Sequence, residues 1–211
     1  VIELIPTGFL GGLDNPRWAV LPDLLEPDRT VIINDVLGEL FPGDATGALV
    51  VAARHPTAGS VPIVVGSRTW TTAPGGGGTF GQGISGIPWR GGDLMTPERV
   101  LPDIESSDDF RTNLGLVNPT WTLVQTFAVE ILDPSGESVG VAHYSLNPRA
   151  HVQINDLLRD KDLQGSGYAA VVRLVSWSSI TPGAGDWPAS NLEVDFVAYA
   201  SKVDNLNNDP Y

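Results

Sequence analysis

Three short patterns in the chain combine residue types that could carry chemistry. The first is Asp160-Lys161-Asp162-Leu163-Gln164-Gly165, with side-chain oxygens at positions one, three and five and glycine at position six, as in a calcium loop. Position twelve of such a loop is a glutamate that binds through both oxygens, and here it is Val171. A solvated turn is therefore favoured, and a weak calcium site at Asp160, Asp162 and Gln164 is the alternative.

The second pattern, Gly76-x-Gly78-x-x-Gly81, fits the formula of a dinucleotide-binding loop. Such a loop works only when a helix follows it directly and receives the pyrophosphate at its N-terminus. Residues 83–88 contain two glycines and a proline, which oppose a helix at that place. We therefore expect no nucleotide cofactor.

The third pattern is the set of three histidines, His55, His143 and His151. They fall on separate candidate strands without the spacing of metal ligands, and the chain contains no cysteine and no G-x-S-x-G motif. We expect no catalytic residue and no enzymatic activity. A hydrolase would require acidic residues that are distant in sequence to converge in a cleft.

Two tryptophans, Trp177 and Trp187, flank a loop rich in serine, proline and glycine. Exposed indole rings at a loop tip could stack on a sugar or anchor a protein contact. The alternative is that both rings pack over the end of the fold. This loop is the best candidate for glycan or protein binding.

The composition indicates which elements position these residues. Twenty-four glycines and seventeen prolines favour short strands joined by turns, so we predict an all-β fold of antiparallel sheets. A net charge of −13 argues against nucleic acid and against an anionic membrane surface. No apolar run approaches the roughly 20 residues of a membrane span, so no membrane insertion is expected. Because the sequence begins at Val1, we expect a processed or excised chain.

The chain contains an internal repeat. Residues 27–37 and 148–158 both fit P-x-x-x-V-x-I-N-D-x-L, which fixes six positions without a gap. The match extends upstream, where Val1 and Pro6 correspond to Val129 and Pro134. We predict two tandem Ig-like β-sandwich modules, residues 1–73 and 110–211, joined by a Gly/Pro-rich connector, residues 74–109. The short polar pair that ends the motif is expected to cap a helical turn or close an Asx turn.

The first module is predicted to lack its N-terminal strand, because residues 110–128 precede the matching point only in the second copy. Three sources could supply a substitute: residues 79–89 of the connector, a neighbouring copy of the chain, or another part of a longer polypeptide. Strand addition from a neighbour would satisfy backbone groups that are costly to leave unpaired. The residues expected at such a subunit contact are Val1, Ile2, Leu4, Phe110, Leu114 and Leu116.

Three stretches of the chain resemble paired Ig-like modules of large secreted proteins of environmental bacteria. They are the sequence FRTNLGLVN at 110–118, Ile154-Asn155-Asp156, and Ala198-Tyr199-Ala200-Ser201-Lys202-Val203-Asp204-Asn205 with Asp209-Pro210. The connector sequence GTFGQ at 78–82 resembles theirs as well, whereas those proteins usually carry another strand before the position of Val1. The resemblance implies a β-sandwich fold and export, and it implies no activity or cofactor.

The expected function is therefore that of a non-enzymatic extracellular or cell-surface structural protein. It would be a subunit of a fibre or filament that assembles with other copies of itself by strand complementation. The alternative is an adhesion module that binds a glycan or a cell-surface protein and belongs to a larger secreted protein.

Overall fold

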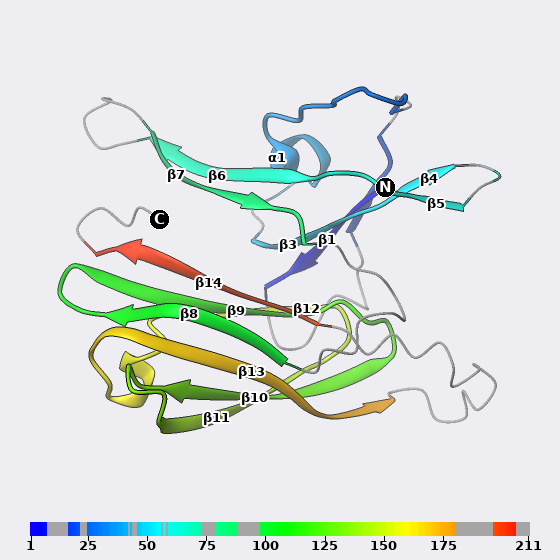
Figure 1. Cartoon of the computed structure of the whole chain (residues 1–211). Helices are drawn as coiled ribbons and strands as arrows, with labels where there is room; N and C mark the ends of the chain where they lie inside the picture. Colours follow the sequence, from blue (N-terminus) through cyan, green and yellow to red (C-terminus); the bar gives the residue numbers. More distant parts are fainter. Residues whose placement is uncertain are drawn as a thin grey trace.

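The structure is a computed structural model that describes residues 1–7, 17–21, 25–41, 43, 46–55, 57, 59–72, 79–87, 98–179 and 196–205 (Figure 1). Antiparallel strands dominate these residues, and their helices are limited to α1 (Val36–Leu40) and a single 3-10 turn, η1 (Arg159–Lys161). The all-β prediction is thus confirmed. The strands are β1 (Ile2–Pro6), β2 (Arg17–Ala19), β3 (Gly47–Val51), β4 (Ala53–His55), β5 (Gly59–Val61), β6 (Gly66–Thr72), β7 (Thr79–Ser85), β8 (Glu98–Ser106), β9 (Phe110–Asn118), β10 (Leu123–Leu132), β11 (Ser138–Leu146), β12 (Ala150–Ile154), β13 (Gly165–Ser179) and β14 (Val197–Asp204).

The second repeat folds into two packed layers. One layer has the strand order β11-β10-β13-β8, and the other has β12-β9-β14, with the β8–β9 turn joining them. Inward residues alternate along the strands, so that Leu114 and Leu116 of β9 share a core with Phe127 and Val129 of β10. The rings of Phe127 and Phe196 lie 5.0 Å apart at its centre. This core holds the second repeat together.

The first repeat contains a smaller sheet, β2-β1-β3, with α1 against one face. Ile2 and Leu4 of β1 point to that face and meet Phe41, which follows α1. Asp35 begins the helix by accepting a hydrogen bond from the Gly38 amide at 2.9 Å. The opposite face of β1 is turned toward the second repeat.

The two repeats share strand pairing as well as sequence. Ile2 lies opposite Val51 just as Val129 lies opposite Val172, so β2-β1-β3 corresponds to β11-β10-β13. This pairing aligns Val129 with Ile2, whereas the sequence match aligned it with Val1. The upstream alignment of the repeats therefore shifts by one residue.

The repeated motif also adopts a similar local structure in both copies. Asp28 and Arg149, its second residues, both have a left-handed backbone, with φ of 59° and 52°. Asp35 and Asp156 each accept a hydrogen bond from the amide three residues on. The polar pair therefore caps a helical turn, as expected from sequence.

Two strands lie within the range predicted to be a connector. β7 pairs with β6, and β8 is an integral strand of the second repeat. Glycine density argued for irregular backbone, but Trp70 lies opposite Gly81, a pairing in which a large ring can cover the bare backbone. The expectation that glycine density keeps residues 74–109 irregular is therefore wrong for these two strands. The formation of β7 agrees instead with the alternative that residues 79–89 supply a strand to the first module.

Residues 29–33, called here the open segment, differ most between the repeats. Their counterpart in the second repeat is β12, which pairs with β9. In the part of the chain that the structure describes, the open segment belongs to no strand, and Ile32 is 80% exposed. β6 pairs with β7 much as β14 pairs with β9. The described part of the connector thus supplies a partner to β6 and shows none for the open segment.

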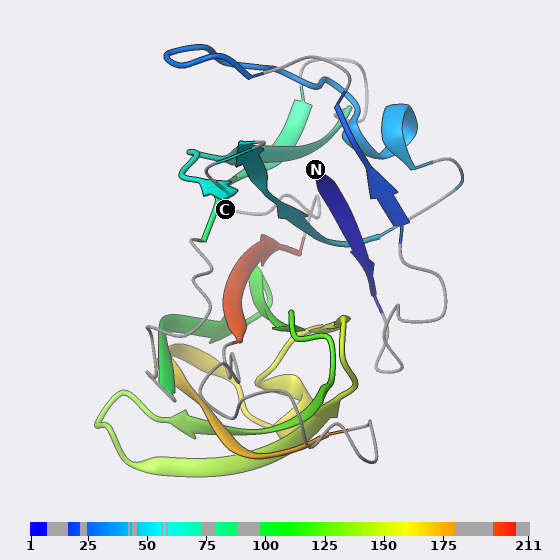
Figure 2. The same ribbon diagram turned by 90° about the vertical axis from the view of Figure 1, so that its right-hand side faces the viewer.

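The first repeat lies on the side of the sandwich that carries β14, with β11 on the far side (Figure 2). The contact between the repeats involves β1 and β3 on one side and β12 on the other. Among the described residues, a buried ion pair joins the two repeats at this contact.

Candidate functional site

The predicted calcium loop folds as a tight turn. Residues 159–161 form η1, and Asp162 ends it with a left-handed backbone, φ 56°. The Lys161 ammonium lies 2.9 Å from an Asp160 carboxylate oxygen. It thereby neutralises the negative charge that a calcium ion would need. No group of three or more metal-binding side chains occurs among the described residues. The geometry gives no support for calcium at Asp160, Asp162 and Gln164.

The other sequence candidates are dispersed. His55, His143 and His151 lie on β4, β11 and β12, which are separate places in the fold. Trp177 is half exposed near the end of β13, opposite Gln125 of β10. Trp187 lies outside the described residues, so the structure does not show whether the two indole rings come together.

The residues predicted at a subunit contact are mostly engaged within the chain. Ile2 and Leu4 are buried in β1, which has a partner strand on each side. Leu114 and Leu116 are fully buried in β9, between β12 and β14. The remaining two, Val1 and Phe110, are also in contact: the Val1 ammonium donates to the Ala52 carbonyl at 2.8 Å, and the Lys202 ammonium lies 5.4 Å from the centre of the Phe110 ring.

A buried ion pair joins the two repeats. Arg149 Nε donates to Glu3 Oε1 at 2.8 Å, and a second guanidinium nitrogen contacts the other carboxylate oxygen. Burial raises the pKa of Glu3 and lowers that of Arg149, and in each case its effect exceeds the opposing influence of the partner. Removal of one partner would leave a buried charge uncompensated, at a cost of about 3–5 kcal/mol.

Two tryptophans cover this ion pair. The Trp18 and Trp121 rings are stacked with centroids 5.3 Å apart and planes 9° apart, one ring from each repeat. The Arg149 guanidinium lies 4.4 Å from the Trp121 ring centre, on which it makes a cation–π contact. Both rings remain partly exposed, so the stack forms the rim of the joint.

A hydrogen-bonded row lies beside the ion pair. Thr7 Oγ1 is 3.0 Å from His151 Nδ1, and the Tyr199 hydroxyl is 3.0 Å from His151 Nε2. Burial lowers the pKa of His151 and raises that of Tyr199, so that both side chains are neutral at pH 7. A neutral phenol cannot stabilise an imidazolium as the carboxylate of a catalytic triad does. Within this row, the hydrogen bond between Thr7 and His151 joins the first repeat to the second.

The comparisons with known proteins add no relative. No family model, no curated protein and no solved structure matches the chain. A search of the described residues finds no helix with the length and hydrophobicity of a transmembrane segment.

The open segment is the remaining candidate site. Val31 is 48% exposed, whereas its counterpart Val152, on β12 beside β9, is 6% exposed and belongs to the larger core. Among the described residues, residues 30–33 have no backbone hydrogen-bond partner, so their amides and carbonyls are available to a strand. The open segment lies within the first copy of the repeated motif. The sequence did not mark it as a subunit contact, because both copies fit the same motif.

Proposed function

We propose that the chain is a non-enzymatic structural subunit that assembles with copies of itself into an extracellular or surface filament by strand complementation. The observation that supports this proposal is the open segment, which keeps the sequence of a paired strand without a partner in the described structure. Export rests on the resemblance to secreted Ig-like modules.

Backbone energetics favour addition of a strand at this segment. An added antiparallel strand would satisfy amides and carbonyls in the way that β9 satisfies those of β12. It would also cover Val31, which is half exposed, and extend the small core around Ile2, Leu4 and Phe41. Burial of apolar area would contribute about 25 cal/mol per Å², in addition to the free energy of the new hydrogen bonds.

The test compares two matched substitutions at exposed valines. Val31→Asp puts a carboxylate where the added strand would cover the side chain, and Val64→Asp puts the same charge at a fully exposed site outside the strands. Electron microscopy and light scattering at neutral pH should show filaments for the wild type and Val64→Asp, and monomers for Val31→Asp. A wild-type protein that stays monomeric at every concentration would refute the proposal.

A second candidate function is binding of a glycan or a surface protein. Trp177 favours it, because this indole is half exposed at the end of the sandwich. Binding to immobilised polysaccharides should then fall in Trp177→Ala and persist in Trp70→Ala, whose ring is equally exposed on β6. Equal binding by both variants would exclude this site.

A further inference from the structure

The strand β11 has features of a donor for the open segment. It pairs with β10 on one side and ends the strand order of its layer. Its nine residues, Ser138–Leu146, include no lysine, arginine, acid or proline. Natural sheet edges usually carry such residues to prevent pairing with other chains. In the other layer, the edge strand β14 does carry charges at Lys202 and Asp204, and the edge strand β12 contacts β1 and β3 of the first repeat.

The sequence of β11 imitates that of β9, the strand that pairs with the counterpart of the open segment. Residues 138–143 read Ser-Val-Gly-Val-Ala-His, and residues 113–118 read Asn-Leu-Gly-Leu-Val-Asn. Each has a polar residue at both ends and the order apolar, glycine, apolar, apolar between them. β9 is buried within its own chain, whereas Val141 of β11 is 52% exposed. β11 thus offers the same pattern on an accessible edge.

We propose that β11 of one copy pairs antiparallel with the open segment of the next copy. This inference rests on the proposed self-assembly and names the two surfaces that meet. The β12–β9 pairing supplies the register, because Val152 lies opposite Leu116 and Gln153 opposite Gly115. Transferred to the new contact, Val31 lies opposite Val141 and Ile32 opposite Gly140.

The local structure of β11 limits the paired stretch. A bulge in the pairing with β10 leaves Val139 as an additional residue, so the regular edge begins at Gly140. Residues 140–143 then face residues 29–32 in reverse order. A carbon atom added at Gly140 meets no atom within 4 Å, so this position leaves room for the large side chain of Ile32.

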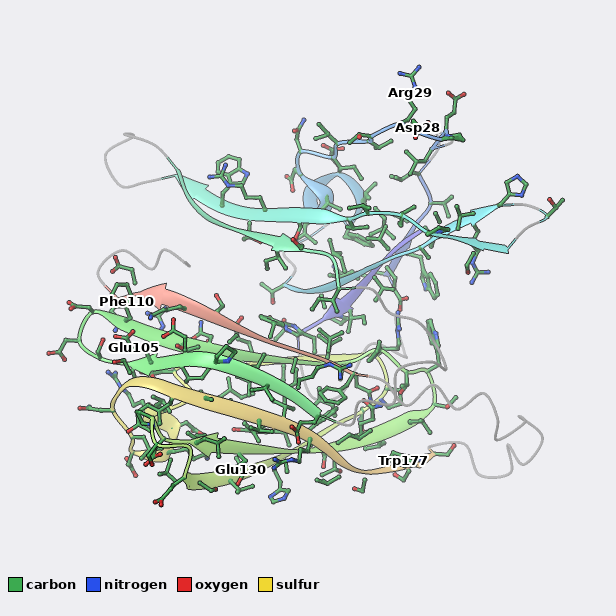
Figure 3. All side chains as sticks on the ribbon, viewed as in Figure 1. Asp28, Arg29, Glu105, Phe110, Glu130 and Trp177 are labelled. Atoms are coloured by element: carbon green, nitrogen blue, oxygen red, sulfur yellow. The ribbon has the colours of Figure 1, made fainter. Side chains whose placement is uncertain are left out.

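The two surfaces lie at opposite ends of the molecule. Asp28 and Arg29 mark one end and Glu130, on the strand next to β11, marks the other (Figure 3). A contact between unlike surfaces is heterologous, and it propagates as an open filament when the rotation between successive copies does not close a ring. Such a filament is polar, because each copy donates β11 at one end and accepts a strand at its open segment at the other end.

Engineered disulfides can test the register because the chain contains no cysteine. Single variants Ile32→Cys and Gly140→Cys, mixed and oxidised under conditions that allow assembly, should yield a disulfide-linked heterodimer on a non-reducing gel. The matched control replaces Gly140→Cys by Ala142→Cys, two residues along the same strand, beyond the reach of a disulfide in this register. The control mixture should yield no heterodimer above background.

The outcomes separate this inference from the proposed function. Filaments that form while Ile32→Cys and Gly140→Cys fail to link would overturn β11 as donor and leave self-assembly intact. A preferred Gly140→Cys homodimer would likewise overturn it, because it would show β11 pairing with itself. Absence of assembly in the wild type would refute the proposed function itself.

Discussion

Burial determines the protonation of the polar side chains between the two repeats. His151 is 5% exposed, and it contacts the hydroxyls of Thr7 and Tyr199. A neutral imidazole suits this site, since it has one donor and one acceptor nitrogen for the two hydroxyls. Protonation would bury a positive charge at this site, which burial disfavours.

Stability should consequently fall in mild acid because of His151. Its pKa in the folded protein lies below the ordinary value of 6.5, so the unfolded chain binds the proton more tightly. The stability that depends on neutral His151 is fully present above pH 6.5, and it is lost as the pH falls from there through the folded pKa. Each pH unit by which burial lowers that pKa is worth about 1.4 kcal/mol.

Denaturation midpoints at pH 7.5 and pH 5.0 would measure this effect. His151→Gln should reduce the difference between the two midpoints, because glutamine keeps a donor and an acceptor without titrating. His143→Gln, on the exposed edge strand β11, should keep the wild-type difference. An unchanged difference in His151→Gln would show that other groups cause the acid sensitivity.

Strands and their pairing were predictable only where a repeat or a turn fixed them. The match of residues 27–37 with 148–158 indicated the aspartate caps, and the turn-forming sequence Asp133-Pro134-Ser135-Gly136 separates β10 from β11. β7 was expected only as one of three alternatives, a strand from residues 79–89, because its glycines favour loop on local grounds and its pairing with β6 is a tertiary effect. Glu3 and Arg149 were missed, because 146 residues separate them.

Gly115 leaves space for a tyrosine ring where β9 pairs with β14. Gly115 of β9 lies opposite Tyr199 of β14, and a β-carbon at Gly115 would be 2.1 Å from the tyrosine ring. Gly115→Ala should therefore force the ring away and destabilise the fold by about 1–3 kcal/mol. Gly140→Ala, where the added carbon meets nothing within 4 Å, should change stability by less than about 0.5 kcal/mol.

A second substitution checks that the clash with the ring is the cause. Tyr199→Val removes the ring and leaves a β-branched side chain that suits a strand. Combined with Gly115→Ala it should cost less than the sum of the two single changes in urea denaturation. Additive costs would mean that the tyrosine ring is not what excludes the methyl group.

At the scale of the whole molecule, the two repeats differ in how much core each owns. Fifteen buried hydrophobic residues form one cluster in the second repeat, against three in the first, among the described residues. The first repeat is further attached through Glu3, Thr7 and Trp18 to side chains of the second. Its stability thus depends on its neighbour, which agrees with a unit that gains from an added strand.

This asymmetry predicts different behaviour of the two halves when they are expressed separately. A fragment of residues 98–211 contains every strand of the larger core and should fold alone, with a cooperative unfolding transition. A fragment of residues 1–97 should lack cooperative unfolding, because the hydrophobic cluster seen among its described residues is too small to offset the conformational entropy of its strands. Circular dichroism melts and amide NMR spectra would report both results. Independent folding of residues 1–97 as a stable monomer would mean that the first repeat needs neither the joint nor a strand from another copy, and the physical reason for assembly would disappear.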